Sequence, residues 1–135
     1  MKESILWKYL KPELEDWGHF QKISDRFTPG IPDVLGVSFG NGWALELKEL
    51  KGIRAPRAKF RPGQLDWLED WDKGGGKSFI ISTLGRKVYV HTWEKGGQLE
   101  EGIHYTQLDS TAILVFQKTV RNTWKEFITQ LMELK

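Results

Sequence analysis

Leucines at helical spacing mark the start of the chain. Leu6, Leu10 and Leu14 recur every four positions within residues 3–17, which predicts an amphipathic helix. Pro12 lies inside this stretch and has no amide hydrogen to donate, so we expect the helix to kink or restart there.

Two further helices are predicted downstream. Pro62 suits the first position of a helix that runs to about Lys73, where three glycines end it. A stronger amphipathic pattern spans residues 119–134, and its apolar face holds Val120, Trp124, Phe127, Ile128 and Leu131.

Shorter apolar runs between the helices predict a sheet. Residues 19–27 have apolar positions without strict alternation, whereas Asn41-Gly42 between two apolar runs, Val34–Phe39 and Trp43–Leu47, indicates a β-hairpin. Further strands rich in β-branched and aromatic residues are expected at 77–84, 86–93 and 112–117. Residues 94–110 show no clear pattern. This order predicts an α/β or α+β fold, in which helices pack on a mixed central sheet.

Composition narrows the class of protein. The chain has 135 residues, which fits a single domain over 1–135 with its own hydrophobic core. It contains no Cys, which excludes disulfide frameworks, thiolate metal sites and Cys nucleophiles. We see no signal peptide or membrane-spanning run at the N-terminus, and therefore expect a cytoplasmic protein of a bacterium or a phage-infected host cell. By analogy, the compact size suits a phage or mobile-element protein.

An acid and a base share one face of the second hairpin strand. Side chains alternate along a strand, so Glu46 and Lys48 point to the same side. With Asn41-Gly42 as the turn, Glu46 lies opposite Val37, and Asp33 falls on the same face. This register leaves Asp33 about 13 Å along the strand from Glu46. A shared metal site would therefore need a register offset or a bend.

Two carboxylates and an ammonium group suit a hard divalent cation. Mg²⁺ prefers oxygen ligands and is typically held by one or two carboxylates with water and phosphate. Plainer interpretations exist, because Glu-x-Lys on a strand is usually a solvated ion pair and Asp33 after Pro32 is common in turns. The order of Pro-Asp, a glycine-centred hairpin, Glu-x-Lys and a basic loop favours the catalytic interpretation.

This ordered set resembles the PD-(D/E)XK nuclease superfamily. Pro32-Asp33 and Glu46-Leu47-Lys48 match its motifs, and the surrounding residues look closest to the virus-type replication-repair nuclease (VRR-Nuc) branch and to Holliday-junction-resolvase-like members. Gln64-Leu65-Asp66-Trp67-Leu68 matches the glutamine motif of their next helix. The resemblance covers about residues 1–93 and implies a restriction-endonuclease-like core that cuts DNA.

The resemblance also implies a role for each matched residue. Asp33 and Glu46 would hold Mg²⁺ or Mn²⁺, with the backbone carbonyl of Leu47 as a further ligand. Lys48 would be the catalytic lysine. Gln64 would position the metal shell, Lys48 or the substrate phosphate.

Helical wheels bear on two polar residues. Gln64 lies near the middle of the apolar face of the helix over 62–73, and a buried amide needs a partner. Its plainer interpretation is a bond to a carbonyl at a buried strand end. The superfamily often adds a metal-binding glutamate from the first helix. Glu3 is the expected ligand because it lies within the leucine stripe, and Glu13 stays possible because Pro12 breaks the register. The plainer interpretation of Glu3 is a solvated charge at a fraying terminus.

Basic residues gather just after the Glu-x-Lys strand. Residues 51–61 hold five cations and no acid, so the rest of the chain, with a total of +2, sums to 2 − 5 = −3. Such a loop would bind backbone phosphates without reading sequence, although a charge run is usually just solvated. The five cations are Lys51, Arg54, Arg57, Lys59 and Arg61, and weaker candidates are Lys22, Arg26, Arg86 and Lys87.

We therefore expect a metal-dependent endonuclease that hydrolyses DNA phosphodiester bonds, with branched DNA as a candidate substrate and a homodimer as a candidate assembly. Two alternatives stay open. A nucleic-acid-binding module without catalysis would use the basic loop and keep Glu46 and Lys48 as a structural ion pair. A protein-interaction domain would use exposed tryptophans. The histidines lack metal-ligand spacing and are expected to be structural or on the surface: His19, His91 and His104.

Overall fold

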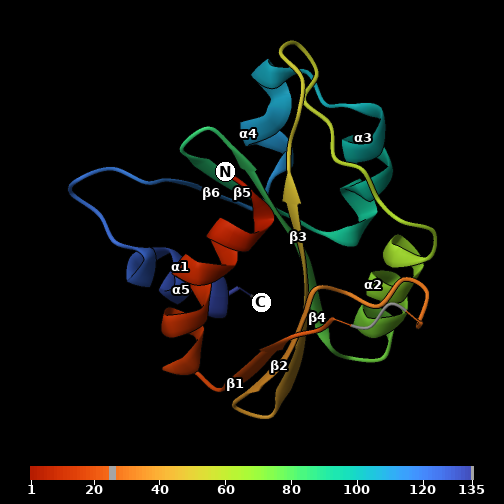
Figure 1. The fold of residues 1–135 in the computed structure, drawn as a ribbon, viewed down its shortest axis with the longest axis vertical. Coiled ribbons are helices and arrows are strands. Elements are labelled where there is room, and N and C mark those ends of the chain that lie inside the picture. The colour runs from red at the N-terminus through yellow and green to blue at the C-terminus, as the bar shows by residue number, and fades with distance from the viewer. Residues whose placement is uncertain (25–26, 135) are drawn as a thin grey trace.

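One six-stranded sheet forms the centre of the molecule in a computed structural model, which describes residues 1–24 and 27–134 (Figure 1). The strands follow one another across the sheet in chain order, from β1 to β6. Their bounds are β1 His19–Lys22, β2 Val34–Ser38, β3 Asn41–Glu49, β4 Lys77–Leu84, β5 Lys87–His91 and β6 Leu114–Gln117. Strands β3 and β4 pair in parallel, and the other neighbours pair antiparallel.

Helices cover the two faces of the sheet in separate groups. One group is α1 Glu3–Glu15 and α5 Trp124–Met132, and the other is α2 Gln64–Lys73, α3 Gly96–Glu101 and α4 Leu108–Thr111. Two 3₁₀ turns, η1 Trp93–Lys95 and η2 Tyr105–Gln107, precede α3 and α4. Each group packs on its own apolar core, and fully burying one leucine contributes about 1.5–3 kcal/mol. The mixed sheet flanked by helices confirms the predicted fold class.

Strand β3 runs through the middle of the sheet and is buried on both faces. Trp43, Leu45 and Leu47 belong to the core under α1 and α5, whereas Ala44 belongs to the core under α2. Alternation places Glu46 and Lys48 on the α2 side. The predicted division of this strand into two faces is therefore confirmed.

The hairpin turns two residues earlier than the sequence predicted. Ser38 pairs with Asn41, so Phe39 and Gly40 are the turn, with φ of +49° and +79°. Asn41-Gly42 instead begins β3. The register shifts by four residues and keeps every side chain on its predicted face, which is why alternation could not reveal the difference.

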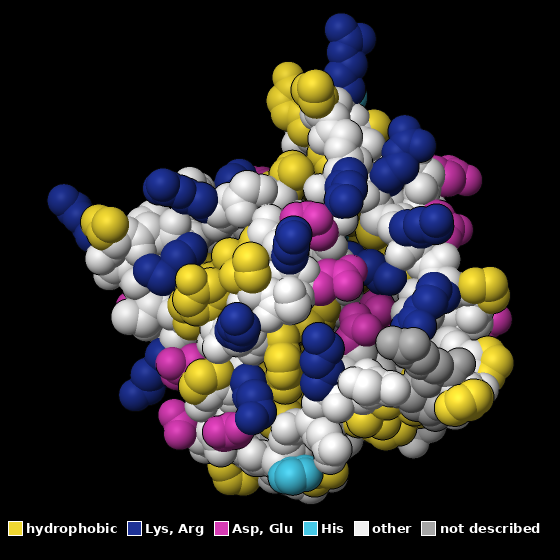
Figure 2. All heavy atoms as spheres, viewed as in Figure 1, with side chains coloured by type: hydrophobic (Ala, Val, Ile, Leu, Met, Phe, Trp, Pro, Cys, Tyr) yellow, Lys and Arg dark blue, Asp and Glu magenta, His cyan; other side chains and the backbone are white. Residues whose placement is uncertain are grey.

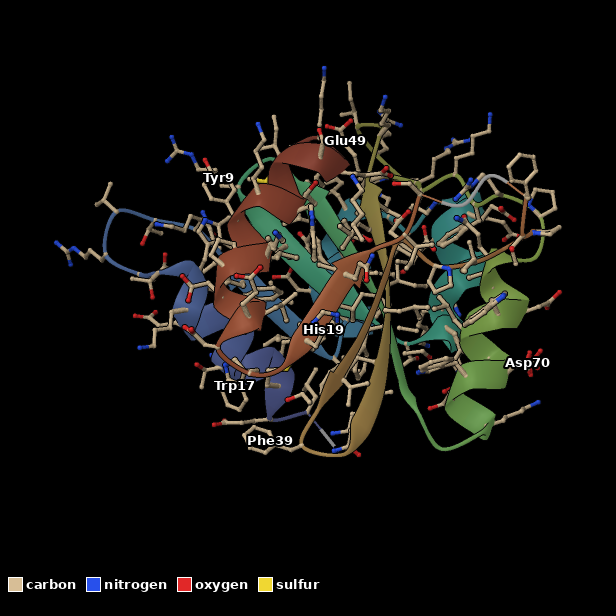
Figure 3. The ribbon with its side chains drawn as sticks, turned by 60° about the horizontal axis from the view of Figure 1, so that its bottom comes forward. Tyr9, Trp17, His19, Phe39, Glu49 and Asp70 are labelled. Carbon is tan, nitrogen blue, oxygen red and sulfur yellow. The ribbon has the colours of Figure 1, made fainter. Side chains whose placement is uncertain are left out.

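Contacts from the segment between α1 and β1, and from β1 itself, account for the position of this turn. The Phe39 ring packs edge-on against Trp17 with centroids 6.2 Å apart, and both side chains lie at the same end of the molecule in Figure 3. The Ser38 hydroxyl donates to the Trp17 carbonyl at 2.7 Å. Phe20 of β1 lies across Gly36, where an added Cβ would fall 2.2 Å from its ring. These tertiary contacts outweigh the local preference of Asn-Gly for a turn.

Three expected boundaries also differ. Helix α1 runs through Pro12 without a restart. Helix α2 begins at Gln64 because Gly63, with φ of +86°, caps it. Helix α5 begins at Trp124, after Thr123 caps it by accepting from the Glu126 N–H at 3.2 Å. Val120 therefore lies outside the helix and is fully exposed, which contradicts its predicted place on the apolar face.

Burial of the tryptophans is mixed. Trp124 is buried as predicted, and Trp7 is buried too, whereas Trp17, Trp67 and Trp71 are only half-buried. Within residues 1–24 and 27–134, no helix has the length and apolar character needed to cross a membrane.

Candidate active site

The corrected register brings Asp33 to the side of β3. Val34 pairs with Leu45, so the next position along the hairpin puts Asp33 opposite Glu46. The Asp33 carboxylate accepts a hydrogen bond from the Leu47 N–H at 2.8 Å, and its backbone carbonyl accepts from the Ile23 N–H at 2.7 Å. The offset that a shared site required is therefore present.

Glu46 is fully buried and only partly satisfied. Its Oε1 accepts from Gln64 Nε2 at 3.0 Å and lies 3.5 Å from Lys48 Nζ. No donor from the described residues reaches its Oε2, which is also buried. The Asp33 carboxyl is within side-chain hydrogen-bonding reach of Glu46, so a proton held by Glu46 would lie between the two groups, and no hydrogen bond joins them once both are ionised.

Gln64 forms hydrogen bonds with both Glu46 and Lys48. Its Oε1 accepts from Lys48 Nζ at 3.0 Å and from the Arg61 N–H at 2.8 Å, while its Nε2 donates to Glu46. The amide is 1% exposed. The predicted need for a partner is confirmed, and the partners are site side chains and a loop N–H rather than a strand-end carbonyl.

Lys48 reaches from this buried cluster toward an open cleft. Its side chain is nearly buried, and its ammonium group lies 4.8 Å from the centre of the Phe60 ring. The aromatic face and the Gln64 carbonyl oxygen hold the charge in place. Lys48 also lines the cavity described below, so it connects Glu46 with solvent.

The ionisable groups of the cluster favour the binding of a cation. Burial, and then the neighbouring Asp33, raise the pKa of Glu46 to about 9, although Lys48 opposes the shift. Partial burial and Asp33 also raise the pKa of Glu3, against the effect of Lys48 and Lys22. Two close carboxyl groups disfavour each other's charge unless a cation lies between them.

The donor set fits a hard divalent cation. Asp33 and Glu46 supply carboxylate oxygens, and the buried Glu46 Oε2 still needs a partner. The Leu47 N–H points to Asp33, and a strand residue directs its carbonyl to the same side as its N–H. Three oxygens can therefore converge without Cys or His, as Mg²⁺ and Mn²⁺ prefer.

Glu3 lies at the edge of this cluster. It is in the first turn of α1 and lines the same cavity as Lys48. Among the described residues, no group of three or more His, Cys, Asp or Glu side chains is close enough together to hold a metal. The side-chain ligands that the fold brings together are therefore Asp33 and Glu46. The expectation that Glu3 joins them as a third carboxylate ligand is wrong. Glu13 is half-buried farther along α1 and does not line the cavity.

A cleft of about 780 Å³ opens beside Lys48. Its cations come from three parts of the chain, and Figure 2 shows acidic side chains in the middle of this face with Lys and Arg side chains around them. Glu49 lies at the end of β3 by the first turn of α1 (Figure 3), 3.3 Å from the N-terminal amino group. The lining cations are Lys2, Lys22, Lys48, Lys51, Arg57 and Lys59.

The basic loop divides into residues at the cleft and residues away from it. Lys51, Arg57 and Lys59 line the cleft, whereas Arg54 and Arg61 are exposed elsewhere. Of the weaker candidates, Lys22 lines the cleft, and Arg86 and Lys87 do not. Arg26 lies outside the described residues.

Sequence reasoning missed two supports of the site, Phe60 over Lys48 and the Arg61 N–H on Gln64. A signal for Phe60 was present. Residues 56–61 alternate between buried positions and exposed cations, so the loop is half-buried like an edge strand rather than simply solvated. Of the histidines, His91 is buried and bonds Thr111 at 3.0 Å, while His19 and His104 are exposed.

No protein-family model matches the chain, and no curated protein matches it. Among solved structures, the chain is similar to Hjc, a Holliday junction resolvase from the archaeal hyperthermophile Archaeoglobus fulgidus. The identity is 12% and the TM-score 0.47, over 83% of this chain and 95% of that one. A similarity at this level assigns no role to any residue.

Proposed function

We propose that this chain is a metal-dependent nuclease that hydrolyses phosphodiester bonds of DNA. The observation that carries the proposal is the pairing of half-buried Asp33 with buried Glu46 beside Lys48, with one Glu46 oxygen left without a donor. A buried carboxylate without a partner is unfavourable. A structural Glu46–Lys48 ion pair has no need of the second carboxylate, whereas a divalent cation does.

Asp33, Glu46 and the Leu47 carbonyl are the residues that would hold Mg²⁺ or Mn²⁺. When bound, such an ion polarises a phosphate and makes water a better nucleophile at neutral pH. The hydrogen bond from the Leu47 N–H fixes the Asp33 carboxylate beside β3. Little reorganisation is then needed on binding, which favours a precise geometry.

The remaining residues act on the substrate and on the attacking water. The Lys48 ammonium group would orient that water or a phosphate oxygen, and Gln64 holds both Lys48 and Glu46 in position. Lys51, Arg57 and Lys59 would bind phosphates next to the one that is cut. Binding of this kind reads the backbone and not the base sequence.

The match of Pro32-Asp33, Glu46-Leu47-Lys48 and the glutamine motif supports membership of the PD-(D/E)XK superfamily as part of the same proposal. The branch nearest VRR-Nuc and the Holliday-junction-resolvase-like enzymes would make branched DNA a preferred substrate and a homodimer the working form. The apolar face of α5 is already used inside the chain, against the core under α1. A dimer would therefore need another surface.

A cleavage assay tests the proposal. Supercoiled plasmid, single-stranded DNA and a four-way junction are incubated with Mg²⁺, Mn²⁺ or EDTA. The variants are Asp33→Asn and Lys48→Ala, with Asp70→Asn as a matched control, because Asp70 is an exposed acid on α2 (Figure 3).

We expect wild type and Asp70→Asn to cut DNA only with a divalent ion, and the two site variants to lose about 100-fold or more in rate. Cleavage that persists in both site variants, or no cleavage with either metal, overturns the proposal. DNA binding without cleavage would support the alternative of a non-catalytic binding module.

A further inference from the structure

A small protrusion after β3 has no part in the proposed chemistry. The chain folds back on itself there, because Lys51 and Arg57 exchange two backbone hydrogen bonds of 2.9 Å each. We call residues 52–55 at its end the knob. Ile53 lies in the knob and is 92% exposed, although isoleucine usually prefers the core. Figure 1 shows this segment projecting beyond the end of β3.

The knob is anchored to the segment that follows α3. The Arg54 carbonyl accepts from the Tyr105 N–H at 2.8 Å, and the Pro56 carbonyl accepts from the Ile103 N–H at 3.1 Å. Gly102 has φ of +106°, and a Cβ there would lie 2.8 Å from the Ala55 carbonyl oxygen. Backbone contacts this close hold the knob as a fixed projection, so the exposure of Ile53 is built into the fold.

Cations surround the exposed isoleucine. Lys51, Arg54 and Arg57 are all exposed, and of these only Lys51 has an ion-pair partner among the described residues, Glu49 at 3.7 Å. Tyr105, 58% exposed, is bonded to the knob through its backbone. Hydrophobic and basic side chains gather together at this end of the molecule in Figure 2. An exposed aliphatic side chain among three cations, two of them without an ion-pair partner among the described residues, is complementary to a polyanion with an apolar interior. A stacked duplex has both properties.

We propose that Ile53 is a wedge that inserts into a base step of bound DNA near the cleaved phosphate. This inference rests on the proposed function. The flanking cations would hold the phosphates while the isoleucine side chain replaces part of the base stacking, a combination that proteins use to kink DNA.

The position of the wedge is bounded by the chain itself. Ile53 is five residues after Lys48, so the Cα atoms of the two residues lie at most roughly 18 Å apart, even with the backbone fully extended. With one phosphate per 3.4 Å along a strand, that span is about five base steps. DNA that is already unpaired or flexible within those steps should be the better substrate, because less stacking must be broken. The wedge therefore gives a physical reason for structure-selective cutting.

The test uses duplexes that carry 2-aminopurine, whose fluorescence rises on unstacking, at successive positions within five steps of the cut. Full-length protein is bound with Ca²⁺ in place of Mg²⁺ to slow cleavage. The variants are Ile53→Ala and Ile53→Leu, with Val120→Ala as the control for loss of an exposed aliphatic side chain.

We expect a fluorescence rise at one position with wild type, Ile53→Leu and Val120→Ala, and loss of most of that rise with Ile53→Ala. In Mg²⁺, Ile53→Ala should cut paired duplex roughly tenfold more slowly, and a mismatch at the same step should restore the rate to within about twofold. Circular dichroism checks that Ile53→Ala is folded.

The outcomes separate this inference from the proposed function. If wild type cuts DNA but fluorescence rises nowhere, or rises equally with Ile53→Ala, the wedge is wrong and the nuclease stands. If fluorescence rises through Ile53 but no metal supports cleavage, the wedge stands and the nuclease is wrong. If the protein does not bind DNA, both are wrong.

Discussion

The Asp33 carboxylate accepts a hydrogen bond from the backbone N–H of Leu47 at 2.8 Å. This hydrogen bond ties the residue before β2 to the middle of Glu46-Leu47-Lys48 and fixes one carboxylate against the other. The fold therefore holds two acidic groups close together. Proteins often retain an unfavourable local arrangement of this kind where function needs it.

Replacing Asp33 by Asn should relieve that repulsion without opening the fold. An Asn side-chain oxygen can still accept from the Leu47 N–H, while the negative charge beside Glu46 is removed. In EDTA at about pH 10, above the Glu46 pKa of about 9 so that both carboxyl groups of wild type are charged, we expect Asp33→Asn to unfold at the same temperature as wild type or higher. Thermal unfolding checks this. A large decrease in melting temperature would show that the Asp33 charge stabilises the fold, contrary to our account.

Gln64 should act through Lys48 and Glu46. We expect Gln64→Ala to weaken metal affinity or cleavage by roughly 10- to 100-fold, as loss of a supporting hydrogen bond around a metal site does. Gln64→Glu should not restore activity, because a carboxylate cannot donate to Glu46. Rates over a range of Mg²⁺ concentrations measure both effects. Gln130→Ala, on the exposed side of α5, is the control, and equal rates for Gln64→Ala and the control would remove Gln64 from the site.

The cleft cations should make DNA binding depend on salt. Removing one cation that binds a phosphate lowers the slope of log affinity against log salt by about 1. Arg57→Ala and Lys59→Ala are therefore each expected to reduce the slope by about that amount, equally for unrelated sequences. Lys125→Ala, an exposed residue of α5, should leave it unchanged. Fluorescence anisotropy from low to high salt measures the slope. If all three variants have the slope of wild type, DNA binds outside the cleft.

His91 should make the fold sensitive to acid. Burial, with a smaller effect of Lys95, lowers the pKa of His91 to about 4. Since the folded-state pKa lies below the unfolded value of 6.5, protons bind the unfolded chain better between these values. The free energy of unfolding should therefore fall as pH drops from 6.5 to 4, by up to roughly 3 kcal/mol.

Denaturant unfolding at a series of pH values tests this expectation. His91→Gln should show a smaller loss than wild type over that range. His19→Gln, at an exposed position of β1, is the matched control and should follow wild type. Identical pH profiles for wild type and His91→Gln would mean that another group causes any loss in acid.

Local sequence patterns were enough to predict which side chains share the site. Alternation in β3 placed Glu46 and Lys48 on one face, and the helical wheel placed Gln64 on the buried side of α2, both as observed. These inferences succeed because they depend only on the period of one element. The burial of Gln64 then follows from its position among apolar neighbours.

The distance from Asp33 to Glu46 could not be predicted in the same way. It depends on the hairpin register, and a four-residue shift preserves every face. The register is set by Trp17, Phe20 and Phe39, which meet across separate elements. The segment 94–110 was missed for a different reason, since α3 and α4 span only six and four residues and are too short to show a period.

Titration with Mn²⁺, followed by electron paramagnetic resonance of the free ion, tests the central claim most directly, because it needs no DNA and no turnover. The account predicts that wild type and Asp70→Asn bind Mn²⁺ in a saturable manner, and that Asp33→Asn and Glu46→Gln lose this binding while remaining folded. Equal binding of Mn²⁺ by wild type and the two site variants would contradict a metal centre at Asp33 and Glu46.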